Sequence, residues 1–375
     1  MKNYLDDIQS TLLLGAGPSG VAPSTYNAIS RTMLGHMDPY FLQIMAEIKH
    51  GLRALMNTEN KMTLPLSGTG SIGMEAAFVN TVERGDKVLI LENGVFGNRM
   101  EDVASRLGAV VTKEEFEWGT PVRVERVKEL LAQDQYKIVA IVHAETSTGV
   151  CNPVEEIGQL VHESGALYLV DTVTSLGGIP VEIDKWKADV VYSGTQKCLS
   201  CPPGAAPISF SDAAMEVILN RKTPVPNWYL DMSMLAKYWT GETRIYHHTA
   251  PISMMYALYQ SVYNILEEGT ENVFARHQAV HERLVAGLEE LGLEMLVEPA
   301  YRLPELNAVK VPEGIDEKKL RADLLSRHHI EISGGLGALA GKVIRIGLMG
   351  YNATPENVDH LLDALRDCLA LQKNA

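Results

Sequence analysis

The sequence predicts an α/β fold, with a mostly parallel sheet in a large domain and a smaller C-terminal α+β domain. Between residues 62 and 210, short apolar segments alternate with helix-forming segments, which is typical of a sheet covered by helices on both faces. From Glu271 the order becomes helix, strand, helix, strand, helix, with more charged positions. We therefore expect an N-terminal arm at residues 1–14, a large domain at 15–268 and a small domain at 269–375.

The composition is that of an ordinary globular protein. With 375 residues, 46% of them hydrophobic, the chain can bury a large core. A net charge of -14 argues against non-specific binding to nucleic acid or to acidic membranes, and leaves small metabolites as natural ligands. No apolar run is long enough to span a membrane, and the acidic start lacks the regions of a signal peptide, so we expect a cytoplasmic protein.

The first glycine-rich loop, Gly15–Gly20, formally matches the dinucleotide fingerprint GxGxxG. Pro18 and Pro23 oppose the helix that this fingerprint needs, so we expect an extended entry loop. The next helix is predicted to begin after Pro39, where apolar residues recur at three- and four-residue steps. His36 precedes that helix, either as a satisfied loop residue or as a substrate contact.

The second glycine-rich loop, Gly68–Gly73, follows the apolar segment MTLPLS and precedes a helix predicted from Met74. The strand KVLILE comes next and ends in Glu92. Taken alone, this arrangement predicts a nucleotide-binding unit and hence an NAD-dependent oxidoreductase. However, glycines that expose backbone N–H groups at a helix N-terminus bind a single phosphate equally well.

A carboxylate ends one predicted strand, and a lysine follows the next one. Leu167–Val170 is apolar without alternation, as in a strand buried on both faces, and leads into Asp171. A second strand, Asp189–Tyr192, delivers Lys197 to the same edge, where open α/β sheets bind ligands. Pyridoxal phosphate needs both groups: a lysine forms the Schiff base and a carboxylate keeps the pyridine nitrogen protonated. A solvated lysine and a turn-capping aspartate are the simpler alternative.

The thiols and histidines give no metal site. Cys198 and Cys201 have no second CxxC pair to complete a zinc site, so we expect packing residues in a reduced chain. His247 and His248 are adjacent on a predicted extended segment, where their side chains should point in opposite directions. We therefore expect no metal.

The segments VDTVTSLGG and YSGTQKCLSCPPG resemble the cofactor segments of class V aminotransferases, and are especially similar to the alanine/serine–glyoxylate aminotransferase family. The resemblance extends from LLLGAGPS at Leu12 to RIGLMG at Arg345. It implies the type I fold of pyridoxal-phosphate-dependent transferases, with Lys197 as the catalytic lysine and Asp171 as its carboxylate partner. It also implies a homodimer whose active sites are shared between subunits.

The resemblance implies a set of contacts to pyridoxal 5'-phosphate. Phe96 takes the position of the aromatic residue, usually tryptophan, that stacks on the ring, although a core phenylalanine would look the same. Tyr246 and Thr249 would bind the phosphate held by the other subunit. The remaining cofactor contacts are Thr69, Gly70, Ser71, Thr146, Asp171, Val173, Gln196 and Lys197.

Arg345 is the predicted substrate-binding residue. It is an arginine in a strand that looks buried, so it needs a partner, either an internal carboxylate or a ligand. By resemblance, it clamps the α-carboxylate of the substrate, which suits the planar guanidinium. Gly17 and Thr146 are the other residues that the resemblance places at the substrate.

The resemblance implies amino transfer from alanine or serine to glyoxylate or pyruvate. A cysteine desulfurase would need a cysteine in the segment 327–340, which has none. Ureidoglycine–glyoxylate aminotransferases tend to carry Asn at the position of Tyr246 and Gln at that of His36, and this activity remains the alternative within the family. A regulator on this fold would need an additional DNA-binding domain, for which the chain has no room. The NAD-dependent oxidoreductase remains the alternative from another class.

Overall fold

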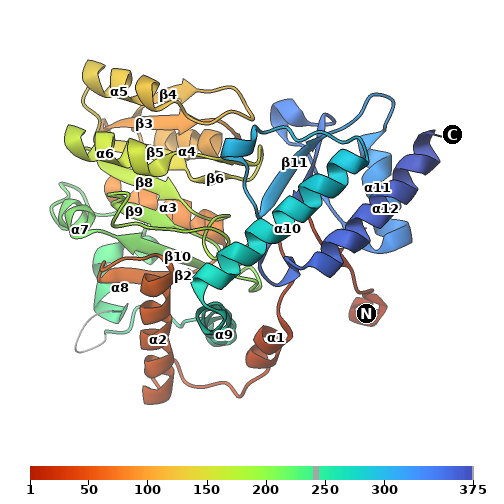
Figure 1. Ribbon diagram of the computed structural model, residues 1–375. Helices are drawn as coiled ribbons and strands as arrows, with labels where there is room; N and C mark the ends of the chain where they lie inside the picture. Colours follow the sequence, from red (N-terminus) through yellow and green to blue (C-terminus); the bar gives the residue numbers. More distant parts are fainter. Residues whose placement is uncertain (240–244, 374–375) are drawn as a thin grey trace.

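The computed structural model describes residues 1–239 and 245–373. Its large domain is built on a seven-stranded sheet with the order β2-β10-β9-β8-β5-β3-β4, and helices cover both faces (Figure 1). β10 runs antiparallel to both of its neighbours, and the other pairs are parallel. The strands are β2 (Met62–Ser67), β3 (Lys87–Glu92), β4 (Val110–Glu115), β5 (Ile138–Val142), β8 (Leu167–Asp171), β9 (Val190–Tyr192) and β10 (Ala205–Phe210).

The central strands are buried from end to end. Every residue of β5 and of β8 is buried, which explains their unbroken apolar sequences. The helices of the large domain are α1 (Pro23–Ile29), α2 (Pro39–Leu55), α3 (Gly70–Thr81), α4 (Val95–Arg106), α5 (Val124–Gln133), α6 (Val154–Ser164), α7 (Asp212–Leu219), α8 (Met232–Trp239) and α9 (Ile252–Glu268). A short hairpin of β6 (Ala144–Glu145) and β7 (Val150–Cys151) follows β5.

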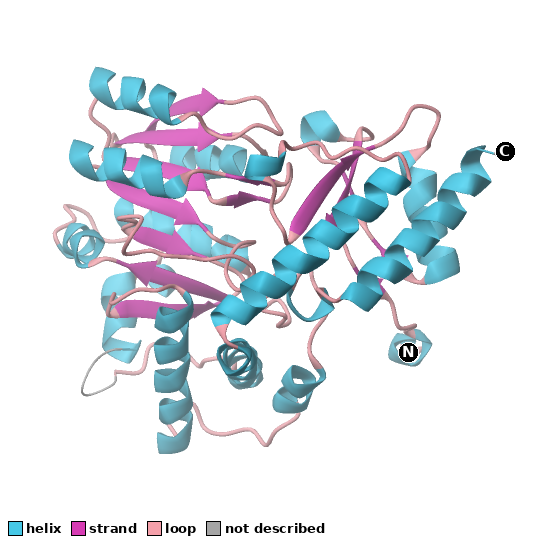
Figure 2. Ribbon diagram, in the orientation of Figure 1, coloured by secondary structure: helices cyan, strands magenta, loops and turns pink. Residues whose placement is uncertain are grey.

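The small domain packs three helices against a three-stranded antiparallel sheet of order β11-β14-β13 (Figure 2). Its helices are α10 (Thr270–Glu290), α11 (Glu317–His328) and α12 (Pro355–Lys373), and its strands are β11 (Leu306–Lys310), β12 (Ile330–Glu331), β13 (Ser333–Gly334) and β14 (Val343–Gly347). Its apolar core is a separate cluster from that of the large domain. The predicted α/β fold with a smaller C-terminal α+β unit is therefore confirmed.

The N-terminal segment joins the small domain rather than standing apart as an arm. β1 (Leu12–Leu13) pairs in parallel with β12, and Leu14 lies in the core of the small domain. The Ala16 N–H donates to Ser333 Oγ at 2.9 Å, and Asn352 Nδ2 donates to the Leu13 carbonyl at 2.8 Å. Only residues 1–11 remain exposed along most of their length.

Two helix starts differ from the expectation. α3 begins at Gly70 rather than Met74, because the glycine loop itself turns into the first helical turn. Pro23 was expected to oppose a helix, but it occupies the first turn of α1. At that position a backbone N–H has no partner within the helix, so proline costs no hydrogen bond. The loop before α1 is not extended throughout as predicted, because residues 15–18 form bends and Gly17 has a φ of +103°. No helix in the described part of the chain is long and apolar enough to cross a membrane.

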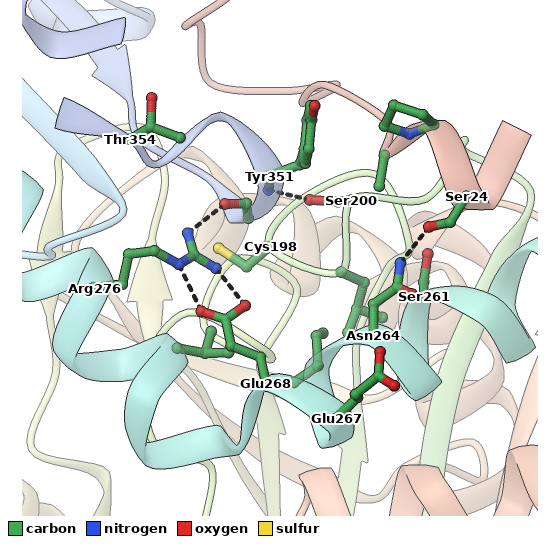
Figure 3. Close-up of a pocket in the computed structure, with 16 residues that line it drawn as sticks. Ser24, Cys198, Ser200, Ser261, Asn264, Glu267, Glu268, Arg276, Tyr351 and Thr354 are labelled. Carbon is green, nitrogen blue, oxygen red and sulfur yellow. Dashed lines mark hydrogen bonds and ion pairs between the residues drawn. The ribbon is translucent and has the colours of Figure 1, made fainter. Parts of the chain in front are cut away.

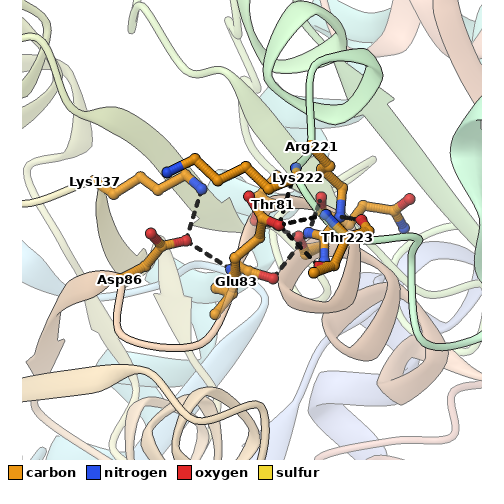
Figure 4. A network of polar contacts seen from close by, with 10 residues as sticks. Thr81, Glu83, Asp86, Lys137, Arg221, Lys222 and Thr223 are labelled. Carbon is orange, nitrogen blue, oxygen red and sulfur yellow. Dashed lines mark hydrogen bonds and ion pairs between the residues drawn. The ribbon is translucent and has the colours of Figure 1, made fainter.

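The C-terminal end of α3 is fixed by a polar network with the loop after α7 (Figure 4). Arg221 Nη1 donates to the carbonyls of Asn80 and Val82, each at 2.8 Å. The Glu83 carboxylate accepts from the Thr223 hydroxyl and N–H at 2.8 and 2.9 Å, and this hydroxyl lowers the pKa of Glu83. The network anchors α3 at the end opposite Gly70.

Candidate active site

The carboxyl ends of the parallel strands converge on one cavity. Asp171 ends β8, Lys197 follows β9, Thr146 follows β5, and Phe96 opens the helix after β3. All four line the same cavity, as open α/β sheets lead one to expect. The other lining residues are Gly70, Ser71, Met74, Arg99, Val142, Val173, Tyr192 and Gln196.

The Lys197 amine is buried and lies against the entry loop. Only 8% of the residue is exposed, and its Nζ donates to the Ala16 carbonyl. Burial lowers the pKa of the amine to about 8, and the charge of Arg345 acts in the same direction. Gly17 has a φ of +103°, and a Cβ there would come within 2.5 Å of Nζ, so glycine is required beside the lysine.

Asp171 lies deep in the same cavity, where it is 3% exposed. Its Oδ1 accepts from the Val173 N–H at 2.7 Å, and its Oδ2 accepts from the Tyr192 hydroxyl at 2.7 Å. Burial raises the pKa of the carboxyl to about 6, while both hydrogen bonds favour the ionised form. The residue is therefore an anchored carboxylate and not the cap of an exposed turn.

Phe96 forms part of the cavity wall, and Arg99 accompanies it one helical turn later. The Arg99 guanidinium lies 5.1 Å from the centroid of the Phe96 ring. Arg99 also lines the cavity, and its charge favours the ionised form of Asp171. Arg99 was not among the predicted site residues, although its i+3 spacing from Phe96 predicts that both face the same way.

The glycine loop presents a helix N-terminus to the cavity. α3 begins at Gly70, where a Cβ would come within 3.5 Å of the Gly194 Cα. Ser71 in the first turn is exposed, as is Thr69 at the N-cap. The Gln196 side-chain oxygen is buried and has no hydrogen-bond partner among the described residues. The backbone N–H groups at this helix N-terminus face a place where an anion can bind, whereas the Gln196 oxygen is an acceptor that needs a donor.

Arg345 joins the small domain to this edge of the sheet. It is 6% exposed, and its guanidinium donates to the carbonyls of Gly334 and Thr146 at 2.8 and 2.9 Å. Its hydrogen-bond partners among the described residues are these two carbonyls, and the charge of the buried acid Glu145 favours its protonated form. Burial lowers the pKa of the guanidinium from its ordinary value. A buried cation with only carbonyl partners can accept an anion.

Glu145 is a buried acid that the sequence analysis missed. It is fully buried, and its Oε1 accepts from the N–H and hydroxyl of Ser147 at 3.0 and 2.6 Å. Burial raises the pKa of its carboxyl to about 7. A Cβ on Gly94 would come within 2.4 Å of the carboxyl carbon, so this acid packs tightly against the start of α4, which carries Phe96.

Tyr246 and Thr249 do not line the cavity of this subunit. Both are exposed, and their hydroxyls lie 3.2 Å apart. The His36 ring lies 5.0 Å from that of Tyr246. The expected opposite orientation of His247 and His248 is wrong, since their Nδ1 atoms are 2.9 Å apart. The residues between Trp239 and Ile245 lie outside the described part of the chain.

All four cysteines are free thiols. Cys151 is partly buried, and the buried ones are Cys198, Cys201 and Cys368. In the described residues, the one group of three potential metal ligands is His328, Asp367 and Cys368, far along the chain from this cavity. Asp367 already pairs with Arg327 and His328 there.

A second cavity, of about 520 Å³, is lined in part by Cys198, Leu199 and Ser200, which follow Lys197 and are called the lysine loop below (Figure 3). Arg276 pairs with Glu268 through two bonds, at 2.7 and 3.0 Å, and also donates to the Gly350 carbonyl. The Ser200 Oγ accepts from the Tyr351 N–H at 2.6 Å. These contacts tie the lysine loop to the small domain.

Glu305 is a buried acid away from the cavity. It is fully buried, and neither carboxyl oxygen has a hydrogen-bond partner among the described residues. Burial raises the pKa of the carboxyl to about 8. Between pH 4.5 and 8, the folded protein therefore holds a proton that the unfolded chain releases, and the free energy of unfolding falls as the pH rises.

We expect Glu305→Gln to remove this pH dependence. The amide cannot ionise, so the variant should gain thermal stability over the wild type as the pH rises from 5 to 9, by roughly 5 °C at the upper end. Thermal denaturation followed by circular dichroism at both pH values measures the difference. Glu313→Gln, at an exposed site, is the control. An equal difference at pH 5 and pH 9 would contradict the expectation.

The donor set fits pyridoxal phosphate. A buried carboxylate suits the ring N–H, a phenylalanine suits the ring face, a helix N-terminus suits the phosphate, and a buried amine with a lowered pKa suits covalent attachment. Fold and cavity together define a transferase of the pyridoxal-phosphate-dependent type I class. Residues 23–361 match the family Aminotransferase class-V, and the chain belongs to this family.

Similar proteins cover nearly the whole chain. An alanine–glyoxylate aminotransferase of Mus musculus is 43% identical over 365 residues, which are 96% of this chain and 88% of that protein. An (S)-ureidoglycine–glyoxylate transaminase of Bacillus subtilis is 38% identical and covers 97% of this chain and 91% of that protein. The crystal structure of an alanine–glyoxylate aminotransferase from Nostoc sp. aligns with a TM-score of 0.95 and 48% identity over 98% of this chain and all of that one. This chain is an aminotransferase, and the oxidoreductase alternative is set aside.

Proposed function

We propose that this chain uses pyridoxal 5'-phosphate, held by Lys197, to move an amino group from L-alanine to glyoxylate. The observation that carries the proposal is that Lys197 and Asp171 line one cavity, while the guanidinium of Arg345 bonds to the carbonyl of Thr146, another residue of that cavity. The alanine–glyoxylate aminotransferases at 41–43% identity support this donor and this acceptor.

Each residue has a separate task in this reaction. When bound, pyridoxal phosphate withdraws electrons from the substrate α-carbon, which makes the C–H bond there acidic. The Lys197 amine, with its pKa near 8, is partly neutral at physiological pH and can take that proton. Asp171 accepts the ring N–H, Phe96 packs on the ring face, and Arg345 orients the substrate carboxylate.

We also propose a homodimer in which each site is completed by the partner. Tyr246 and Thr249 are exposed and away from the cavity of their own subunit, which supports a role in the site of another. α1 and α2 pack against α9, and these helices expose Tyr26, Tyr40, Tyr259 and Tyr263. Clustered exposed aromatic residues mark a surface for protein contact.

The test is the visible absorption of the purified protein during the two half-reactions. L-alanine should bleach the absorption of the bound cofactor, and glyoxylate should restore it. Parallel rates with L-serine and (S)-ureidoglycine as donors, and with pyruvate as acceptor, rank the substrates. Faster bleaching by (S)-ureidoglycine would favour the activity of the Bacillus subtilis relative. A protein that stays colourless with added pyridoxal phosphate would refute the proposal.

Arg345→Lys should raise KM for L-alanine by about 10- to 100-fold. An ammonium group cannot reproduce the two parallel bonds of a guanidinium to a carboxylate, and a hydrogen bond to a charged group contributes about 1.5–3 kcal/mol. Steady-state kinetics at fixed glyoxylate measures this. Arg302→Lys is the control, because the Arg302 guanidinium donates to the Val297 carbonyl in the small domain. An unchanged KM would remove Arg345 from the substrate site.

A further inference from the structure

Tyr192 is held rigidly against Asp171. The two residues are direct partners in the pairing of β8 and β9, so their side chains lie on the same face of the sheet. Tyr192 is fully buried, and its hydroxyl donates to Asp171 Oδ2 at 2.7 Å. Gly73 of α3 packs against the same side chain, where a Cβ would come within 2.9 Å of the Tyr192 Cβ. The Tyr192 side chain is therefore fixed by α3 near its Cβ and by the carboxylate at its hydroxyl.

Asp171 is surrounded by groups of both signs. Lys197, after β9, and Arg99, on α4, favour its ionised form, whereas Glu145, after β5, is an acid whose own pKa is raised by Asp171. Among the described residues, Tyr192 is the side chain that hydrogen-bonds to this carboxylate. The other donor is the Val173 N–H.

We propose that Tyr192 is a positioning residue, whose hydroxyl keeps Asp171 ionised and turned toward the ring nitrogen of the bound cofactor. The inference rests on the proposed function, because it assumes that pyridoxal phosphate occupies this cavity. A donor that bonds to the charged form of a carboxyl stabilises that form. A carboxylate that accepts a hydrogen bond from the tyrosine hydroxyl is less basic. The proton between Asp171 and the ring nitrogen of the cofactor therefore stays on the ring nitrogen.

Loss of the Tyr192 hydroxyl should change the protonation of Asp171 in a predictable direction. In Tyr192→Phe, the buried carboxylate loses a donor that the solvent cannot replace at a fully buried position. Asp171 then takes up a proton at a higher pH than in the wild type. A neutral acid cannot pair with a protonated ring, so cofactor binding should weaken first at the acidic end of the pH range.

The chain offers a matched control in Tyr168. It is also fully buried and lies in the adjacent strand β8, but its hydroxyl donates to the Val154 carbonyl at 3.1 Å. Tyr168→Phe therefore removes the same oxygen atom from the same sheet without changing the bonds of Asp171. Any general effect of hydroxyl loss appears in both variants.

The experiment measures the dissociation constant of pyridoxal phosphate for the apoprotein from pH 5 to pH 8, by quenching of tryptophan fluorescence. For Tyr192→Phe we expect affinity to fall about tenfold at pH 6, and the pH at which binding weakens to rise by about one unit. Tyr168→Phe should follow the wild-type curve. As a second variant that keeps the packing, 3-fluorotyrosine incorporated at position 192 carries a more acidic hydroxyl and should move the curve to lower pH.

The outcomes separate the inference from the function on which it rests. If Tyr192→Phe weakens binding equally at every pH, or not at all, the inference is wrong while the proposed function stands. The same holds if both phenylalanine variants shift alike. If Tyr192→Phe does not fold, a 3-fluorotyrosine curve that coincides with the wild type overturns the inference. Failure of the wild type to bind pyridoxal phosphate would overturn both.

Discussion

Lys197→Ala is expected to lose covalent attachment of the cofactor and at least about 10⁴-fold of the transamination rate. The residue is both the attachment point and the proposed proton acceptor, and proton transfer by a placed side chain contributes about 10²- to 10⁴-fold by itself. Its burial, and its pKa near 8, suit both tasks. After borohydride reduction, mass spectrometry should find the cofactor mass on the wild-type peptide that contains Lys197 and on no peptide of the variant.

Lys185→Ala serves as the control for this change. Lys185 is an exposed lysine with surface ion pairs to Glu155 and Glu182, so its removal should leave attachment and rate unchanged. Cofactor attached at a different lysine in the wild type would refute the assignment of Lys197.

Asp171→Asn is expected to reduce the rate by about 10²- to 10³-fold. The amide has nearly the same shape but no charge, so it cannot stabilise a protonated ring, and loss of one preorganised electrostatic contact typically has an effect of this size. The affinity for pyridoxal phosphate should fall as well. Steady-state kinetics and a fluorescence titration of the apoprotein measure the two effects.

Asp189→Asn is the matched comparison. This aspartate lies at the opposite edge of the sheet, where its carboxylate accepts from the Tyr168 N–H and the Ser211 hydroxyl. Its replacement should reduce stability and leave the cofactor affinity unchanged. Equal losses of affinity in both variants would mean that Asp171 acts only through the stability of the sheet.

Local sequence was sufficient to predict the bounds of a strand where that strand is buried on both faces. The segment KVLILE forms β3 with the bounds that its apolar run predicts, because burial of all but the first residue leaves no other arrangement for it. Helix starts were predicted less well. At α3 the glycine loop continues directly into the helix, and at α1 a proline begins a helix that it was expected to oppose.

Local sequence could place some of the site residues but not those whose role depends on how the strands pair. Lys197 and Asp171 could be placed at one edge because Asp171 ends a predicted strand and Lys197 lies in the loop that follows another. Tyr192 could not, because its role depends on the register between β8 and β9, which the sequence does not state. The directions of the His247 and His248 side chains likewise depend on local backbone geometry. The two side chains approach each other, although an extended chain was expected to point them in opposite directions.

The contacts of the N-terminal segment determine when the site can be completed during synthesis. Lys197 bonds to Ala16, whose N–H is held by Ser333, and Leu13 is held by Asn352, 339 residues further along the chain. A nascent chain that has folded its seven-stranded sheet still lacks Ser333, Arg345 and Asn352. Contacts of such long sequence separation form last. We therefore expect the surroundings of Lys197 to be complete only after translation has reached the small domain.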